Sequence, residues 1–181
     1  MNISQRLLLT LSMLFGAIIL QAVFAISLLA GFQDRFEFVQ TNAIPSIKDI
    51  GKLIDQSNQL ALTLYKHQSQ IHDSNMPAVE QQIDQQINGL KALTDYYLAN
   101  DISNDKDKRL TQVAFENIQQ VASRLPAFLT ASRAHQNEVS LGLLESESGI
   151  GAAIRQMISD FQKQLNLNIV IGDELRATNR S

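Results

Sequence analysis

Seven residues with charged or hydrogen-bonding side chains stand near the apolar stripes of predicted helices, and they are the best candidates for binding a ligand. They are Ser57, Asn58, Tyr65, Lys66, Arg124, Arg133 and Arg155. Burying a guanidinium group is costly unless it is paired, so an arginine beside a helical core without an obvious acidic neighbour suits an anionic ligand. Arginines together with apolar walls favour a small carboxylate, such as an aromatic or cyclic acid.

Each of these residues also has a simpler interpretation. An arginine that flanks a core position often extends its head group to water along an apolar stem, which would apply to Arg124 and Arg155. Tyr65 can be a packing residue with a solvated hydroxyl. The seven are predicted as one site because counting from the expected far-end turns places most of them at a similar height, with Arg133 nearer that end.

Catalytic, metal and cofactor sites are not indicated. His67, His72 and His135 form no metal-binding motif, the HExxH pattern is missing, and cysteine is absent. We expect His67 and His135 to be structural residues near core stripes. Gly149 and Gly151 fall inside a predicted helix rather than after a strand, so they form no phosphate-binding loop. The sequence therefore predicts a protein that is not an enzyme and needs no cofactor.

The elements that must position these residues begin with a long apolar segment. Leu7 to Phe32 is a run of 26 residues without a charged side chain. As a helix it would span about 39 Å, more than the roughly 30 Å hydrocarbon core of a bilayer. A cleaved signal peptide ending at Val23-Phe24-Ala25 is the alternative, although the apolar run continues beyond that point. We expect an uncleaved transmembrane helix over residues 7–32.

The orientation of this helix follows from the charges beside it. Arg6 and the amino terminus precede it, whereas Asp34, Arg35 and Glu37 follow it without a net positive charge. Positive residues tend to stay in the cytoplasm. Residues 1–6 are therefore expected in the cytoplasm and residues 33–181 in the periplasm of a bacterium, with the anchor in the inner membrane.

Four amphipathic helices are predicted after the anchor. Apolar residues recur at helical spacing over residues 47–71, 79–97, 110–128 and 150–169. Pro45 is expected to begin the first helix or to kink it, Pro77 to begin the second, and Pro126 to interrupt the third.

The predicted breaks lie at residues 72–77, 100–107 and 135–140. Helices of matched length with short connections predict an all-α fold, an antiparallel up-down-up-down four-helix bundle. Its first helix would be continuous with the transmembrane helix or follow it.

Composition narrows the possible partners. The net charge of −3 argues against nucleic acid as a partner, because no basic stripe is present to neutralise phosphates. Without cysteine, an exported domain must be held together by core packing alone. The last residues, from Gly172 to Ser181, are polar and helix-compatible without a stop signal. We therefore expect a second membrane span after Ser181, and a longer receptor of which this chain is a part.

The order of anchor, the segment Asn-Ala-Ile-Pro-Ser-Ile-Lys-Asp-Ile-Gly-Lys-Leu at 42–53 and three further helices resembles the ligand-binding region of bacterial methyl-accepting chemotaxis receptors. The resemblance extends over essentially the whole chain. It implies a homodimer with a ligand site between helices one and four of one subunit and helix one of its partner. It also implies a sliding fourth helix whose movement reaches a cytoplasmic kinase and adaptor through the part that follows Ser181.

The aspartate receptors of this family hold their ligand with three arginines on helix one. Alignment of residues 53–60 with that helix places these arginines at Ser57, Leu62 and Lys66, of which only Lys66 is basic. Lysine supplies a point charge rather than a bidentate contact, which argues against aspartate or serine as the ligand. Two further functions remain open: the sensor of a histidine kinase or other membrane signalling protein, and a membrane-anchored adaptor bundle without a ligand.

Overall fold

The structure of residues 2–178 is a computed structural model, and within this range it is helical throughout, without a strand. The elements in chain order are α1 (Ile3–Phe38), the π-helix η1 (Val39–Ala43), α2 (Ile44–Gln68), the 3₁₀ turn η2 (Asp73–Asn75), α3 (Met76–Asn100), α4 (Asp105–Arg133), α5 (Asn137–Glu145) and α6 (Ile150–Thr178). The all-α prediction is confirmed.

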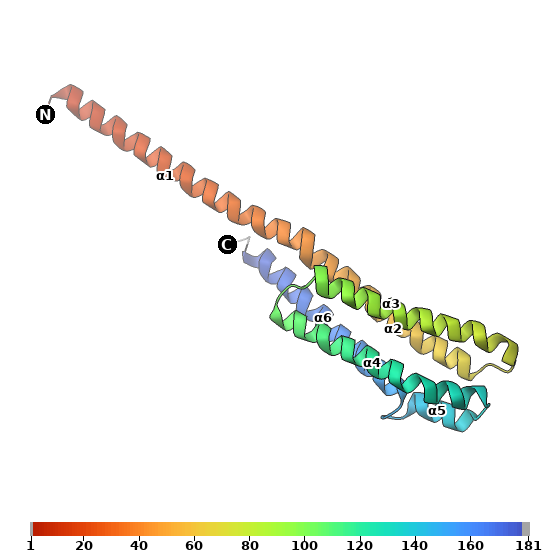
Figure 1. The fold of residues 1–181 in the computed structure, drawn as a ribbon. Coiled ribbons are helices and arrows are strands. Elements are labelled where there is room, and N and C mark those ends of the chain that lie inside the picture. Colours follow the sequence, from red (N-terminus) through yellow and green to blue (C-terminus); the bar gives the residue numbers. More distant parts are fainter. Residues whose placement is uncertain (1, 179–181) are drawn as a thin grey trace.

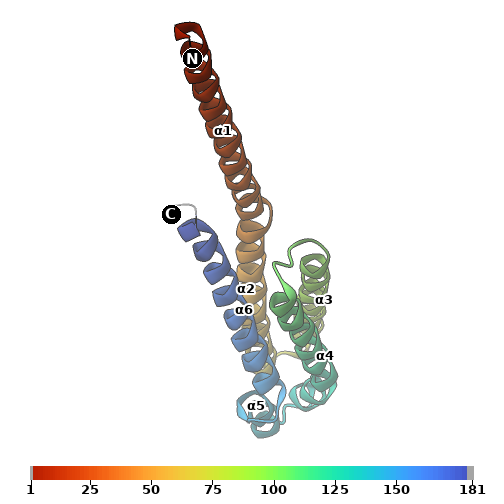
Figure 2. The ribbon, with the colours of Figure 1, turned by 90° about the vertical axis from the view of Figure 1, so that its left-hand side faces the viewer.

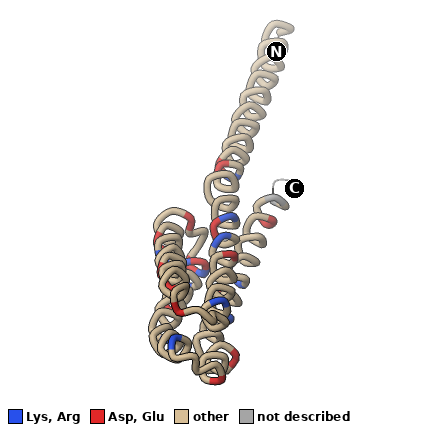
Figure 3. Tube along the Cα trace, turned by 90° about the vertical axis from the view of Figure 1, so that its right-hand side faces the viewer, with Lys and Arg blue, Asp and Glu red and all other residues tan. Residues whose placement is uncertain are grey.

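α1 projects alone from the rest of the molecule (Figure 1). None of its residues is buried, and its exposed side chains include large apolar residues along its whole length. The helix is long and apolar enough to cross a membrane, a property that secretory signal sequences share. Figure 3 shows that the charged residues gather in the other helices, in keeping with the uncharged run from Leu7 to Phe32.

A π turn joins α1 to α2 without breaking the helical path. Pro45 lies at the start of α2 and has no N–H to donate to the preceding turn. The chain widens just before it, where the backbone N–H of Ile44 donates to the carbonyl of Val39. α1, η1 and α2 together form one rod from Ile3 to Gln68. Pro45 thus lies in the first turn of α2, which is one of the two alternatives that the sequence leaves open, and the continuous helix accommodates the proline by a π turn.

α2, α3, α4 and α6 pack around one hydrophobic core (Figure 2). α2 contacts α3 and α6, and α4 contacts the same two helices. The core is built from buried residues of all four, the largest being Tyr97, Phe128 and Phe161. We call the end of this helical region where α1 joins α2 the base, and the opposite end, with η2 and the α4–α5 turn, the tip. At the base, α6 also contacts η1.

The connections differ from the sequence prediction in three places. The loop expected over residues 100–107 is shorter, because Asn104 caps α4 by accepting hydrogen bonds from the backbone N–H groups of Lys106 and Asp107. Pro126 does not interrupt the third helix, since α4 runs through it to Arg133. The break near residues 135–140 is a turn at His135, with φ of 52°, followed by an additional helix, α5.

Gly149 and Gly151, both predicted inside a helix, shape the α5–α6 connection. Gly149 lies in the loop and Gly151 in the first turn of α6. A Cβ at Gly149 would lie 2.0 Å from the carbonyl oxygen of Leu143, and one at Gly151 would lie 1.8 Å from that of Leu144. Only glycine permits this close approach of the backbones. The helical assignment of Gly149 was therefore wrong.

Candidate functional site

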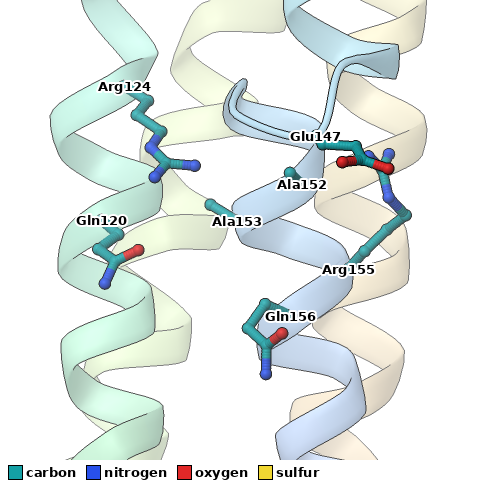
Figure 4. Close-up of a pocket in the computed structure, with 7 residues that line it drawn as sticks. All are labelled: Gln120, Arg124, Glu147, Ala152, Ala153, Arg155 and Gln156. Carbon is teal, nitrogen blue, oxygen red and sulfur yellow. The ribbon is translucent and has the colours of Figure 1, made fainter.

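Arg124 of α4 and Arg155 of α6 line the same pocket (Figure 4). The pocket has a volume of about 430 Å³ and is bounded by α4, α6 and the α5–α6 loop. Its lining residues are Gln120, Arg124, Glu147, Ala152, Ala153, Arg155 and Gln156. Two of the predicted site residues are thus brought together, and they come from different helices.

The guanidinium group of Arg124 is fixed by the backbone of the α5–α6 loop. Its Nη1 donates to the carbonyl oxygen of Gly149 over 2.9 Å, and the side chain is half-buried. The loop can present this carbonyl because Gly149 and Gly151 let it pass close to the end of α5. A carbonyl oxygen satisfies one donor of the arginine without cancelling its charge.

Arg155 is held by the carboxyl end of α5. Its guanidinium donates to the carbonyl oxygens of Leu144 and Ser146, each over 3.1 Å, and to that of Glu145 over 3.4 Å. These carbonyls lie at the negative end of a helix dipole, which favours a cation. Arg155 is also exposed, so its position is fixed while its charge faces solvent and the pocket.

The other polar residues in and beside the pocket affect its net charge. Glu147, an exposed residue of the α5–α6 loop, is the one acid among the lining residues, which leaves two arginines against one carboxylate. Gln156 donates from Nε2 to Asp160 over 2.9 Å. Burial would raise the pKa of Asp160, but hydrogen bonds from Gln156, Lys163 and Asn117 together lower it below its usual value. Asp160, which bonds the lining residue Gln156, therefore stays ionised.

The four candidates on α2 lie elsewhere. Ser57 is buried and donates to the carbonyl of Leu53 over 2.6 Å, and Asn58 is exposed and donates to that of Ile54 over 3.0 Å. Tyr65 is 41% exposed, and Lys66 is exposed as well. None of the four lines the arginine pocket. The hydroxyl of Ser57 is therefore hydrogen-bonded within its own helix, as the hydroxyls of mid-helix serines often are.

Arg133 takes part in a different group at the tip. Its Nε and Nη2 each donate to Glu80 over 2.6 Å, in a bidentate pair. Glu80 also contacts Nε2 of His67 at 3.1 Å, and Nδ1 of His67 lies 2.7 Å from Ser132 Oγ. The hydrogen bond from Arg133 is the main cause that lowers the pKa of Glu80 to about 2, against the opposing effect of burial.

His67 and His135, which both lie near the tip, have different roles from one another. His67 is fully buried with both ring nitrogens bonded, which confirms a structural histidine. His135 was expected near a core stripe, but it is exposed and contacts Asp73 at 2.8 Å. The difference arises because His135 forms the turn after α4 in the left-handed conformation.

A buried polar network at the base was not anticipated from the sequence. Asp107 lies at its centre and accepts hydrogen bonds from Tyr97 Oη, Gln164 Nε2 and Asn168 Nδ2 over 2.8, 2.8 and 3.2 Å. It also accepts from the backbone N–H of Ser103 over 2.9 Å. Burial and the neighbouring Asp107 raise the pKa of Tyr97 well above its usual value, so its hydroxyl remains a donor. The network joins α3, α4 and α6.

A carboxyl group with an unpaired oxygen lies beside this network. Asp101 is 3% exposed, and its Oδ2 is buried without a hydrogen-bond partner. Desolvation, reinforced by the nearby Asp49, raises the pKa of Asp101 to about 6. Ser46 donates to the carbonyl of Asp101 over 2.6 Å, which ties this turn to α2. The base therefore links all four long helices through polar groups.

Sequence reasoning missed Glu147, the carbonyl of Gly149 and the network around Asp107. The run Ser-Glu-Ser-Gly at 146–149 is a typical loop signal and could have revealed the connection that holds both arginines. Among residues 2–178, no group of three or more histidines or acids is arranged to hold a metal ion. Comparison with protein-family models, with curated proteins and with solved structures gave no match.

Proposed function

We propose that this chain is the ligand-sensing part of a bacterial transmembrane receptor of the chemotaxis type, and that it binds a small organic carboxylate. In this proposal residues 7–32 cross the inner membrane. α2, α3, α4 and α6 form an antiparallel up-down-up-down four-helix bundle in the periplasm. The resemblance of residues 42–53 to the chemotaxis receptors supports the class of protein.

The observation that carries the ligand class is the anchoring of Arg124 and Arg155 by backbone carbonyls. Each guanidinium is held in place without being neutralised by a carboxylate hydrogen bond in the described structure. Each guanidinium group presents a fork of donors that suits the bidentate recognition of a carboxylate, and both residues line one pocket. The exposed Glu147 would reject ligands with excess negative charge, which favours a monocarboxylate or an acid that also carries a cation.

The pocket is well placed for transmitting a signal. It lies on α6, the helix whose far end contacts η1, where the rod from α1 begins to enter the core. A ligand that bridges α4 and α6 would favour one relative position of these helices over another. We propose that this small displacement of α6 is passed to the membrane, as in the receptors that the sequence resembles. A homodimer is part of the same proposal.

Binding of organic acids to the full chain in lipid nanodiscs tests the proposal. We expect calorimetry with a panel of aliphatic, aromatic and cyclic carboxylates to find at least one saturable ligand. Arg124→Ala and Arg155→Ala should each weaken its binding by 10-fold or more, about 1.4 kcal/mol. Arg109→Ala, an exposed arginine of α4 outside the pocket, is the matched control and should bind normally. Binding by none of the acids would favour a ligand-free adaptor.

A further inference from the structure

Two buried carboxyl groups lie together at the base, one on α2 and one at the carboxyl end of α3. Asp49 is 7% exposed and Asp101 is 3% exposed. Asp101 is the C-cap residue of α3, and its backbone N–H donates to the carbonyl of Tyr97 over 2.9 Å. This end of a helix carries the negative pole of the helix dipole, which disfavours a negative charge. The position of Asp101 therefore favours a carboxyl group that carries a proton.

The charged groups that act on Asp101 come from two neighbouring helices. On α2, Asp49 repels a negative charge at Asp101, whereas Lys52 attracts it less strongly. Lys52 is half-exposed and already paired with Asp49 over 2.6 Å. On α4, Asp107 adds a weaker repulsion. The side chains that η1 and α6 place against the turn after Asp101 are neutral amides. Ionisation of Asp101 is thus opposed by two acids.

The unpaired Oδ2 of Asp101 fits a proton rather than a larger ligand. This atom is buried, so a solute cannot reach it, whereas a proton needs no cavity. A protonated carboxyl group is a donor, and a hydrogen bond between the side chains of Asp101 and Asp49 favours this form. When both groups are ionised, they are acceptors only, and they repel each other. One proton therefore converts a repulsion between α2 and the end of α3 into an attraction.

The turn at residues 101–103 is bonded to the rod. Ser46 of α2 donates to the carbonyl oxygen of Asp101 over 2.6 Å. Asn42 of η1 donates from Nδ2 to the carbonyl oxygen of Ile102 over 3.2 Å. A change in the distance between the two carboxyl groups therefore acts on a turn that is fixed to the π turn of the rod.

The same turn is bonded to α6. Oγ of Ser103 lies 2.8 Å from Oδ1 of Asn42 and 2.6 Å from Oδ1 of Asn168, which belongs to α6. A hydroxyl group has one hydrogen, so Ser103 donates fully to only one of these two acceptors at a time. The turn therefore has two alternative hydrogen bonds at this point, one to the rod and one to α6.

We propose that Asp101 and Asp49 form a proton-operated switch that sets the position of the rod relative to α6. With the proton bound, the two carboxyl groups hold α2 against the end of α3. Without it they separate, and the turn at residues 101–103 passes the change to η1 and α6. The pKa of Asp101, which is about 6, places this change at mildly acidic pH. The switch does not depend on the arginine pocket, and only the passage of its state across a membrane rests on the proposed function.

The test measures the distance between the rod and α6 in the full chain in nanodiscs. The sequence contains no cysteine, so Ile44→Cys and Val170→Cys provide two exposed sites for spin labels without background. An excess of unlabelled chain restricts the distances measured by double electron–electron resonance to those within one chain. From about pH 4.5 to about pH 7.5 we expect a change of about 1–2 Å, the size of typical helix shifts. Its midpoint should lie near pH 6.

Three variants assign this change to the carboxyl pair. Asp101→Asn resembles the protonated form and should keep the low-pH distance at every pH. Asp49→Asn removes the main repelling charge and should move the midpoint to lower pH. Asp105→Asn, an exposed acid of the same segment, is the matched control and should keep the wild-type midpoint. Circular dichroism should give the same helix content for all three.

Ser103→Ala separates sensing from transmission. It retains both carboxyl groups, so the titration of Asp101 should be unchanged. Carboxyl NMR of labelled aspartate measures this titration, with the signal assigned by its loss in Asp101→Asn. The variant removes the hydroxyl that lies between Asn42 and Asn168, so the distance between the labels should change less with pH than in the wild-type chain.

Two results would overturn the proposal. The first is a wild-type distance that stays the same over the whole pH range. The second is a response of Asp101→Asn to pH that equals that of the wild-type chain. An unchanged midpoint in Asp49→Asn would also contradict it, because the second carboxyl group would then have no part in the switch. These measurements contain no organic acid, so their outcome is independent of the proposed carboxylate site.

Discussion

The base and the tip of the helical region hold their polar groups in opposite ways. At the tip, Glu80 is ionised between Arg133 and His67, and Arg133 is exposed to solvent. At the base, Asp107 is buried among neutral amide and hydroxyl donors, and Asp101 keeps an unpaired carboxyl oxygen. The pKa of Glu80 is lowered to about 2, whereas that of Asp101 is raised to about 6.

This difference suggests different tasks for the two ends. A bidentate ion pair at an exposed end connects neighbouring helices, and its strength depends little on how the rest of the core is packed. A buried network works only when every member is in place, so it specifies one arrangement of α3, α4 and α6 and resists others. If α6 is displaced by a ligand, the hydrogen bonds to Asp107 are among those that must change.

The largest effect is expected for Asp107→Ala. It would leave the buried donors of Tyr97, Gln164 and Asn168 without their shared acceptor. We expect a loss of about 3 kcal/mol or more in the free energy of unfolding, measured by urea denaturation of the full chain in detergent. Asp105→Ala, an exposed acid in the same helical turn, should cost less than about 1 kcal/mol. Equal losses in both variants would show that the network contributes little.

The second largest effect is expected in the pH dependence of the free energy of unfolding, to which Asp101 at the base contributes. Asp101 has a folded pKa of about 6, above its value of 3.8 in a free chain, so the folded state favours the protonated form. Its contribution to stability is present below pH 4 and is lost as the pH rises to about 6, by up to roughly 3 kcal/mol. Asp101→Asn should remove this dependence when unfolding is measured from pH 4 to 7. A variant with the wild-type profile would contradict the raised pKa.

The tip should respond to pH in the opposite direction and more weakly. Glu80 has its pKa lowered from 4.5 to about 2, so its contribution is present above pH 4.5 and is lost as the pH falls towards 2. Because Arg133 is exposed, we expect Glu80→Gln to cost only about 1–2 kcal/mol at pH 7. Adding salt should reduce that cost but leave the cost of Asp107→Ala nearly unchanged. Identical salt dependence at both ends would remove the distinction between them.

The comparison also shows what the sequence could predict. Apolar spacing located the four long helices, because burial of one helix face leaves a periodic trace in the chain. The base network left no such trace. Asp107 stands in a strongly polar segment that suggested a loop, yet it is fully buried, because the partners that stabilise it come from α3 and from residues of α6 far along the chain.

The candidate site shows the same limit. Arg124 and Arg155 could be selected because each flanks a core stripe, and the structure brings them to one pocket. The sequence alone did not show that the α5–α6 loop would supply the carbonyls that hold them. Nor did it show that Arg133 would form an ion pair with Glu80, since the two are 53 residues apart in the chain. Contacts between distant residues depend on helix rotation, which spacing does not determine.

The π turn at Val39–Ala43 has one more consequence. Such a turn holds one residue more than an ordinary helical turn, and each residue of an α-helix advances the azimuth by about 100°. The exposed apolar surface of α1 is therefore turned by a fixed angle relative to the side of α2 that meets the core, compared with an uninterrupted α-helix. Deleting a single residue from this turn would rotate α1 against the helices of the core while leaving the sequences of α1 and α2 intact.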